Sequence, residues 1–233
     1  MTRRSASSHR WLARQRRDVY ARKAAEEGQI SRAHFKLEQL DLRFKLLRRG
    51  QRVLELGAAP GGWTHYVEGR IGPGCLVACD QRPIAAGAET RVVVGWYGDT
   101  ETDQAIAVAL GDMPVDLVLS DMAPNISGIR SADQARAMEL ADLALEAGIR
   151  WLGPGGDLVV KLFQGEGMDA WLKQVRQVFA KVYQVKPKAS RPDSREVYVV
   201  ARARRPESTV ADVPAQAHDS GYDDSDTLGL TVC

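Results

Sequence analysis

Residues 53–63 read Val-Leu-Glu-Leu-Gly-Ala-Ala-Pro-Gly-Gly-Trp, and this stretch decides the fold. It begins as an apolar strand, turns through small residues and leads into an amphipathic segment over residues 63–71. A strand, a glycine-rich turn and a helix in this order is how α/β proteins bring backbone N–H groups to a nucleotide-like ligand. Gly57, Gly61 and Gly62 lack a Cβ, so the backbone can take a positive φ and approach a ligand closely. A tight turn without a ligand is the plainer interpretation, but the density of glycine, proline and tryptophan favours a binding loop.

The spacing within this loop limits the kind of ligand. The loop does not match GxGxxG, the dinucleotide fingerprint, nor GxxxxGK[ST], the phosphate loop of nucleotide triphosphatases. A cradle for phosphates is therefore disfavoured. The sequence predicts a nucleoside-like ligand without phosphates.

Apolar runs alternate with amphipathic segments along most of the chain. After the opening strand and helix, strands are expected over 75–80, 91–94, 115–121, 157–163, 182–186 and 196–201, and helices over 11–27, 31–47, 101–111, 131–151 and 168–181. This alternation predicts a doubly wound, Rossmann-like α/β fold with a mostly parallel, seven-stranded sheet. A short connection joins the last two strands, which predicts one antiparallel edge strand, because a parallel return needs a longer crossover.

The helix expected over 31–47 has two different stripes. Ser31 can cap its first turn. Apolar residues recur at steps of three and four along one side, which indicates a face packed on a core. The opposite stripe holds Arg32, Lys36 and Arg43, so we expect it to present a basic surface.

Charge divides the chain into three parts. The 233 residues carry a net charge of only +2, but residues 1–50 hold 14 Lys and Arg against 5 Asp and Glu, a net charge of +9. Residues 206–233 hold 6 Asp and Glu and neither Lys nor Arg. We therefore expect a basic N-terminal extension and helix over 1–28, one catalytic or binding domain over 29–205, and an acidic, disordered tail over 206–233. The basic end suggests RNA or DNA as a partner, against the alternative of a merely solvated charged face.

The spacing of the cysteines and the length of the apolar runs indicate the cellular compartment. The three cysteines and four histidines show neither metal-ligand spacing nor a disulfide framework, and no apolar run reaches about 18 residues. We expect a cytoplasmic protein with no metal site and no membrane span.

Ligands of parallel sheets bind beyond the carboxyl ends of the strands, where this chain places several charged residues. Asp80, Asp99 and Asp121 follow three of the expected strands, and Lys161 lies near the end of a fourth. A lysine in an apolar run needs a partner, and Asp121 and Glu196 are the candidates. Purely structural roles for these residues remain open. The Lys161 side chain can extend to solvent, Asp121 can form an Asx turn, and Glu196 can be a solvated edge residue.

Five motifs together resemble one family. They are SRAHFKLEQLD (31–41), GAAPGGW (57–63), SDMAPNISG (120–128), VVKLFQGEG (159–167) and SREVYVVA (194–201). In this order they are similar to the FtsJ/RrmJ type of ribosomal RNA 2′-O-ribose methyltransferase, over about residues 11–204. The resemblance is to the bacterial large-subunit enzyme, which acts on a uridine in the A-loop of the peptidyl-transferase centre of 23S rRNA.

The resemblance implies S-adenosylmethionine as the methyl donor and a set of site residues. The implied catalytic tetrad is Lys36, Asp121, Lys161 and Glu196, and the implied donor site is Gly61, Trp63, Asp80, Asp99 and Asp121. In the family pattern the loop amides and Trp63 hold the methionine end, Asp80 binds the ribose hydroxyls and Asp99 meets the adenine amino group. The implied partner is ribosomal RNA, within the 50S subunit, and the implied state is a monomer.

Two alternatives stay open from the sequence. The same chemistry can serve transfer RNA or another RNA. A non-catalytic ribosome-assembly factor would use the same basic face without methyl transfer.

Overall fold

The computed structural model describes residues 18–111 and 113–206. Most of the expected basic extension and nearly all of the expected acidic tail therefore lie outside the described residues. The helices are α2 (Val19–Glu26), α3 (Ala33–Phe44), α4 (Gly62–Ile71), α5 (Thr100–Leu110), α6 (Arg130–Trp151) and α7 (Met168–Val178). The strands are β1 (Arg52–Leu56), β2 (Cys75–Asp80), β3 (Arg91–Val94), β4 (Val115–Ser120), β5 (Leu152–Phe163), β6 (Phe179–Val185) and β7 (Glu196–Arg204).

One seven-stranded sheet organises the described chain, in the order β3-β2-β1-β4-β5-β7-β6. The strands from β3 to β5 pair in parallel, and β7 pairs antiparallel with both β5 and β6. The Rossmann-like α/β prediction and the antiparallel pairing near one edge are confirmed. The reversed strand β7 lies one position inside the edge, because β6 pairs only with β7. The chain reverses its direction of winding between β1 and β4, which is where such sheets bind ligands.

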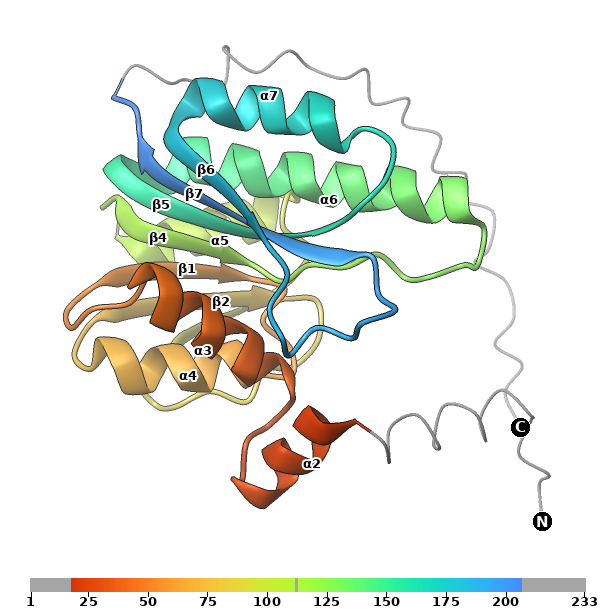
Figure 1. Ribbon diagram of the computed structural model, residues 1–233. Coiled ribbons are helices and arrows are strands. Elements are labelled where there is room, and N and C mark those ends of the chain that lie inside the picture. Colours follow the sequence, from red (N-terminus) through yellow and green to blue (C-terminus); the bar gives the residue numbers. More distant parts are fainter. Residues whose placement is uncertain (1–17, 112, 207–233) are drawn as a thin grey trace, which may run out of the picture.

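Alternation along the buried strands builds two apolar layers. In β1, Leu54 and Leu56 join the cluster that holds Trp171 of α7, whereas Val53 joins the cluster that holds Leu37 of α3. Successive side chains of a strand point to opposite faces, so α3 and α4 cover one face while α5, α6 and α7 cover the other. The two layers are visible in Figure 1, with α2 set apart beside the start of α3.

Several element boundaries differ from the sequence prediction, most of all at α3, β5 and β6. Helix α3 stops at Phe44, because Lys45 takes a left-handed φ of 54° and its N–H returns to Asp41. Strand β5 begins at Leu152 rather than at 157, since Leu152 pairs with Val115 before the register of the two strands shifts. Strand β6 begins at Phe179, so α7 is shorter than expected.

A helix that crosses a membrane must be long and predominantly apolar, and this requirement applies to the helices of the described ranges. Among them, none combines the length and the apolar character required to cross a bilayer.

Candidate active site

The glycine loop after β1 is packed too tightly for side chains at two positions. Gly57 has φ 73°, and a Cβ there would lie 2.6 Å from the backbone nitrogen of Met122. Gly61 has φ 114°, and a Cβ there would lie 2.2 Å from the carbonyl oxygen of Ala85. The amides of Gly57 and Ala58 also donate to the carbonyl of Cys79, at 2.9 and 3.1 Å. The loop is therefore held close to the ends of β2 and β4, as a binding loop requires.

Asp80, at the end of β2, is joined directly to this loop. Its Oδ2 accepts a hydrogen bond of 2.9 Å from the backbone N–H of Ala59, and its Oδ1 accepts one of 2.9 Å from the N–H of Arg82. The structure thus places Asp80 beside the loop, as predicted. Its expected contact with ribose hydroxyls stays a prediction.

Asp99 lies on a separate hollow between the end of β3 and the start of α5. The hollow has a volume of about 560 Å³ and is lined by Val93, Val94, Gly95, Gly98, Asp99, Thr100, Glu101, Thr102 and Ala105. Asp99 is exposed there, directly before the first residue of α5. The expected contact of Asp99 with an adenine amino group stays a prediction.

Trp63 is a buried residue of the core, which the sequence did not indicate. Its side chain is only 2% exposed, and its indole N–H donates to the carbonyl of Ala33 at 2.8 Å. Its ring also packs against Tyr198, with centroids 5.7 Å apart. The expected contact of Trp63 with a donor stays a prediction, and its buried indole leaves the backbone as the means of making it.

Lys161 and Asp121 form a compact pair at the carboxyl ends of β5 and β4. The Lys161 ammonium lies 3.1 Å from Asp121 Oδ1 and also donates to the Asp121 carbonyl oxygen. Asp121 is fixed beside β1, because its N–H donates to the carbonyl of Leu56 at 3.0 Å. The exposed fraction of the Lys161 side chain is 8%, so the lysine is not extended into solvent. The predicted pairing of this lysine with Asp121 is therefore present.

Lys36 and Glu196 form a second pair next to the first. Lys36 Nζ lies 2.7 Å from Glu196 Oε2, and the hydroxyl of Ser190 donates to Glu196 Oε1 at 2.6 Å. Glu196 thus holds Lys36 and not Lys161. The basic stripe expected on α3 is not a fully exposed surface at Lys36: the residue is 9% exposed, because its ammonium is held by Glu196 and lies near the ring of Tyr198.

Tyr198 links the two pairs, and the sequence analysis did not identify it. Its hydroxyl donates to Asp121 Oδ1 at 2.8 Å, and Lys36 Nζ lies 5.7 Å from its ring centroid. Burial raises the pKa of Tyr198 well above its ordinary value, with the charge of Asp121 adding to the rise. Tyr198 therefore stays a neutral donor that holds the Asp121 carboxylate.

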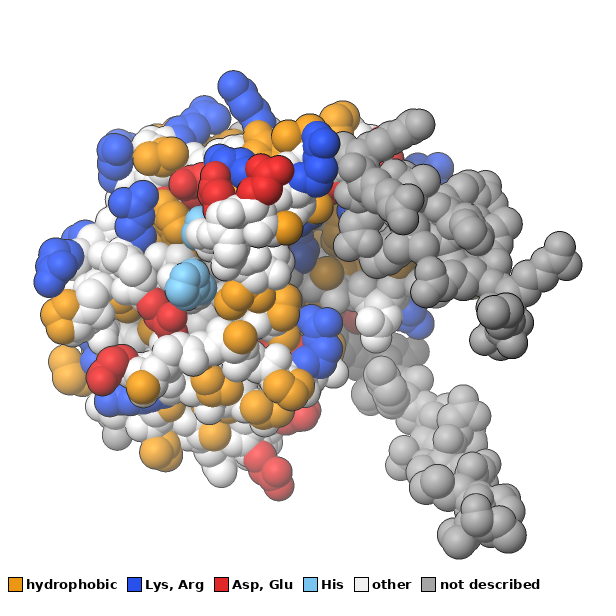
Figure 2. Space-filling view, turned by 90° about the horizontal axis from the view of Figure 1, so that it is seen from below, with side chains coloured by type: hydrophobic (Ala, Val, Ile, Leu, Met, Phe, Trp, Pro, Cys, Tyr) orange, Lys and Arg blue, Asp and Glu red, His pale blue; other side chains and the backbone are white. Residues whose placement is uncertain are grey.

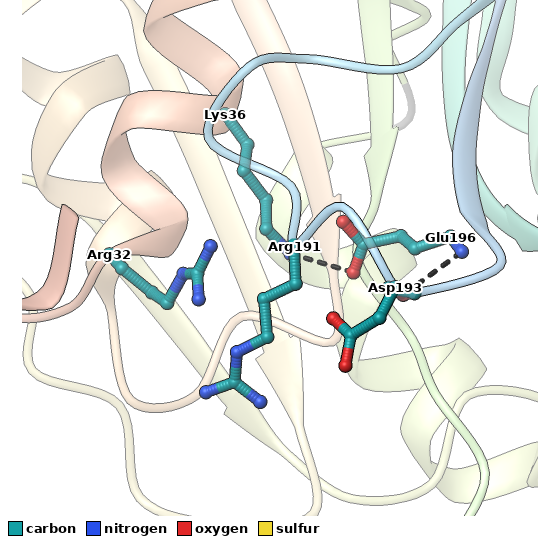
Figure 3. Close-up of a pocket in the computed structure, with 6 residues that line it drawn as sticks. Arg32, Lys36, Arg191, Asp193 and Glu196 are labelled. Carbon is teal, nitrogen blue, oxygen red and sulfur yellow. Dashed lines mark hydrogen bonds and ion pairs between the residues drawn. The ribbon is translucent and has the colours of Figure 1, made fainter. Parts of the chain in front are cut away.

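A cleft opens beside the Lys36–Glu196 pair. It has a volume of about 430 Å³ and is lined by Arg32, Lys36, Arg191, Asp193, Ser194 and Glu196. Figure 3 shows Arg32 reaching in from the start of α3 and Arg191 from the segment before β7. Burial lowers the pKa of Arg32, although the nearby Asp18 opposes that shift. The cleft thus places two guanidinium groups next to the tetrad.

Basic side chains are dispersed on the face of the molecule that is seen from below in Figure 2. Figure 2 looks from below onto the side of the molecule that carries α3 and α4, and Lys and Arg side chains lie mainly around its rim. The cleft, in contrast to that face, is lined by two arginines and a lysine.

Together, the reversal of winding, the glycine loop and the carboxylates at the strand ends define a Rossmann-like protein with a lysine–carboxylate centre at the carboxyl ends of its strands. A family model described as FtsJ-like methyltransferase matches residues 29–204. The chain belongs to the FtsJ-like methyltransferase family.

A solved structure shares the fold. It is a crystal structure from Plasmodium falciparum of a protein provisionally described as a ribosomal RNA methyltransferase. The identity is 23%, the TM-score is 0.68, and the match covers 75% of this chain and 97% of that one. At this identity the likeness supports the fold alone.

Proposed function

We propose that this protein transfers a methyl group from S-adenosylmethionine to the ribose 2′-oxygen of a uridine in 23S rRNA, at the A-loop of the peptidyl-transferase centre. The observation that carries the proposal is the tetrad: Lys36, Asp121, Lys161 and Glu196 converge from four elements into two adjoining ion pairs. Membership of the methyltransferase family and the basic N-terminal part of the chain support it.

The residues present fit S-adenosylmethionine as the donor. Gly57 and Gly61 pack against the protein's own backbone at Met122 and Ala85, which fixes the loop beside the strand ends where the donor would lie. Asp80 supplies a carboxylate for two ribose hydroxyls, and Asp99 an acceptor for an exocyclic amine. When bound, the donor supplies an electrophilic methyl group on a sulfonium centre. The chain itself supplies the placement of the acceptor oxygen and of its proton.

Lys161 is the residue proposed to act on the acceptor hydroxyl. An ammonium group has three N–H donors, and Asp121 takes two of them through its carbonyl and carboxylate oxygens. The third is left for the ribose 2′-oxygen: it would hydrogen-bond to one lone pair and leave the other directed toward the methyl group. As the oxygen–methyl bond forms, the sulfonium–methyl bond would break and the hydroxyl proton would pass to solvent. Positioning of this kind supplies a large part of the rate of group transfer. Lys36, held by Glu196, adds a second positive charge that favours a developing oxyanion.

RNA would lie across the cleft, Lys36 and the basic segment 186–195. Because Lys and Arg contacts to phosphates release counterions, binding should weaken as salt rises. The proposed substrate is rRNA within the 50S subunit, bound by a monomer in the cytoplasm.

Asp80→Ala tests the donor half of the site. We expect it to weaken S-adenosylmethionine binding by at least about tenfold, because it removes charge-assisted hydrogen bonds to the ribose. It also removes the hydrogen bond that the Ala59 N–H donates to Asp80. Titration calorimetry measures the change. Asp169→Ala, an exposed carboxylate on α7, is the matched control. Equal affinities of the two variants would remove Asp80 from the donor site.

The function itself is tested by product mapping. The purified protein is incubated with labelled S-adenosylmethionine and with 50S subunits, naked 23S rRNA or transfer RNA, and each RNA is then mapped for 2′-O-methylribose. A single modified uridine in the A-loop is the expected result. Modification of transfer RNA alone would change the substrate, and donor binding without transfer to any RNA would favour an assembly factor.

A further inference from the structure

Asp18 precedes α2 and lies outside the part of the chain that matches the family model. Its two carboxylate oxygens have different partners. Oδ1 accepts the backbone N–H of Ala21 at 3.2 Å and so caps α2. Oδ2 accepts from Arg32 Nη1 and from Arg191 Nε, the latter at 3.4 Å. The side chains of Asp18 and Arg32 are 7% and 18% exposed, whereas that of Arg191 is 49% exposed, so the junction is buried at Asp18 and open at Arg191.

The two arginines that share Asp18 are the two arginines of the cleft beside the tetrad. Arg32 also donates to the carbonyl of Ala189, and the Ala189 N–H donates to Gln39 of α3 at 3.1 Å. Asp18 therefore ties together three segments that are distant in sequence: the start of α2, the start of α3 and the segment before β7. In Figure 3 the guanidinium groups of Arg32 and Arg191 lie on the same side of the Lys36–Glu196 pair.

We propose that Asp18 is a positioning residue for RNA binding, which holds Arg32 and Arg191 as a preorganised pair for a phosphate of the acceptor strand. The inference rests on the proposed RNA substrate. Two guanidinium groups repel each other, and a shared carboxylate offsets that repulsion. It also restricts two long side chains before RNA arrives, so less conformational freedom is lost on binding.

The donors that remain suit a phosphate. Arg191 uses Nε for Asp18, and among the described residues none accepts from its two Nη atoms. A pair of Nη groups is well placed to bind two oxygens of one phosphate. Asp18 would therefore act through Arg191 and Arg32, without touching the RNA.

The direction of the change in RNA affinity distinguishes a positioning role of Asp18 from a purely electrostatic effect of its charge. Removing a carboxylate makes the cleft more positive, and long-range attraction alone would then strengthen RNA binding. Loss of the clamp weakens binding instead. Asp18→Asn tests this contrast cleanly, because asparagine also caps helices well and can keep the bond to Ala21.

The experiment compares wild type, Asp18→Asn and the control Glu26→Gln, which removes an exposed carboxylate from α2. For Asp18→Asn we expect the Kd for an A-loop RNA, measured by fluorescence anisotropy, to rise about fivefold, and KM for RNA with it. The kcat at saturating RNA and the affinity for S-adenosylmethionine should not change. Glu26→Gln should bind RNA as wild type does, or slightly more tightly.

A second variant tests whether Asp18→Asn acts only by weakening the cap of α2. Arg191→Gln leaves the cap of α2 in place and should weaken RNA binding. Asp18→Asn should then add less than it does in the wild type, since part of its effect passes through Arg191. Additive effects, or RNA binding by Asp18→Asn at or above wild-type strength, would overturn the proposal. Because RNA binding is measured without catalysis, absence of methyl transfer by the wild type would count against the proposed function only.

Discussion

Lys161→Ala is expected to reduce methyl transfer by a factor of about 10² to 10⁴ while leaving S-adenosylmethionine affinity unchanged. The lysine is the one tetrad member whose ammonium is shared between the carbonyl and the carboxylate of Asp121, which fixes its remaining N–H. Without it the ribose hydroxyl has no group to orient its lone pair toward the methyl group. The donor half of the site is built mainly from the glycine loop and Asp80, and Tyr198 still holds the Asp121 carboxylate when Lys161 is removed.

Transfer of labelled methyl groups to RNA under single-turnover conditions measures this loss. Lys181→Ala, which removes an exposed lysine from β6, is the matched control and should transfer at the wild-type rate. Removing one partner of a buried ion pair can also destabilise the fold, so thermal unfolding is recorded for both variants. Lys161→Met keeps most of the side-chain volume and should show the same loss. A Lys161 variant that is folded and still methylates RNA near the wild-type rate would exclude the assignment.

The pairing within the tetrad shows how far the sequence could lead. Strand ends could be located from apolar runs, which placed Asp121 near Lys161. Which lysine Glu196 would hold depended on register: Glu196 lies opposite Phe163 and Tyr198 opposite Lys161 in the β5–β7 pair. Antiparallel register is set by the whole pair of strands and its connection, so the sequence left both partners open.

Tyr198 and Asp18 were missed for different reasons. Tyr198 is two residues beyond Glu196 in the same strand, so the period of two places both on the face that carries Lys161. That signal was present in the sequence and was not used. Asp18 is 14 residues from Arg32 and 173 from Arg191, and no local pattern connects it to either. Contacts of that kind exist only once the chain has folded.

Glu55 also escaped the sequence analysis, although it lies within the stretch that decided the fold. It stands on β1, two residues before Gly57, and its side chain is completely buried. Burial raises the pKa of Glu55 from 4.5 to about 8, the negative charges of Asp121 and Glu68 add to the rise, and hydrogen bonding from Thr64 opposes it. The carboxyl group is therefore mainly neutral at pH 7 in the folded protein, and ionised in the unfolded chain.

The sign of the resulting pH dependence follows from proton binding. Between pH 4.5 and about 8 the folded state holds a proton on Glu55 that the unfolded state has released. Stability from this group is therefore complete below pH 4.5 and is lost as pH rises toward 8, with a maximum slope of about 1.4 kcal/mol per pH unit. Over the whole window the loss is on the order of 5 kcal/mol, a large share of the stability of an ordinary domain.

Glu55→Gln should remove this dependence, because the amide has nearly the same shape and cannot ionise. Urea unfolding at pH 5.5 and 7.5 measures the free energy of unfolding of both proteins. Between these two pH values the wild type should lose about 2 to 3 kcal/mol through Glu55, and the variant should not show this loss. His34, whose pKa burial lowers, makes stability rise with pH in the same range, but it is present in both proteins and cancels from their difference. Parallel stability profiles for the two proteins would mean that Glu55 titrates alike in the folded and unfolded states. The carboxyl beneath the glycine loop would then be ionised at neutral pH, and its negative charge would have to be counted among those facing the donor site.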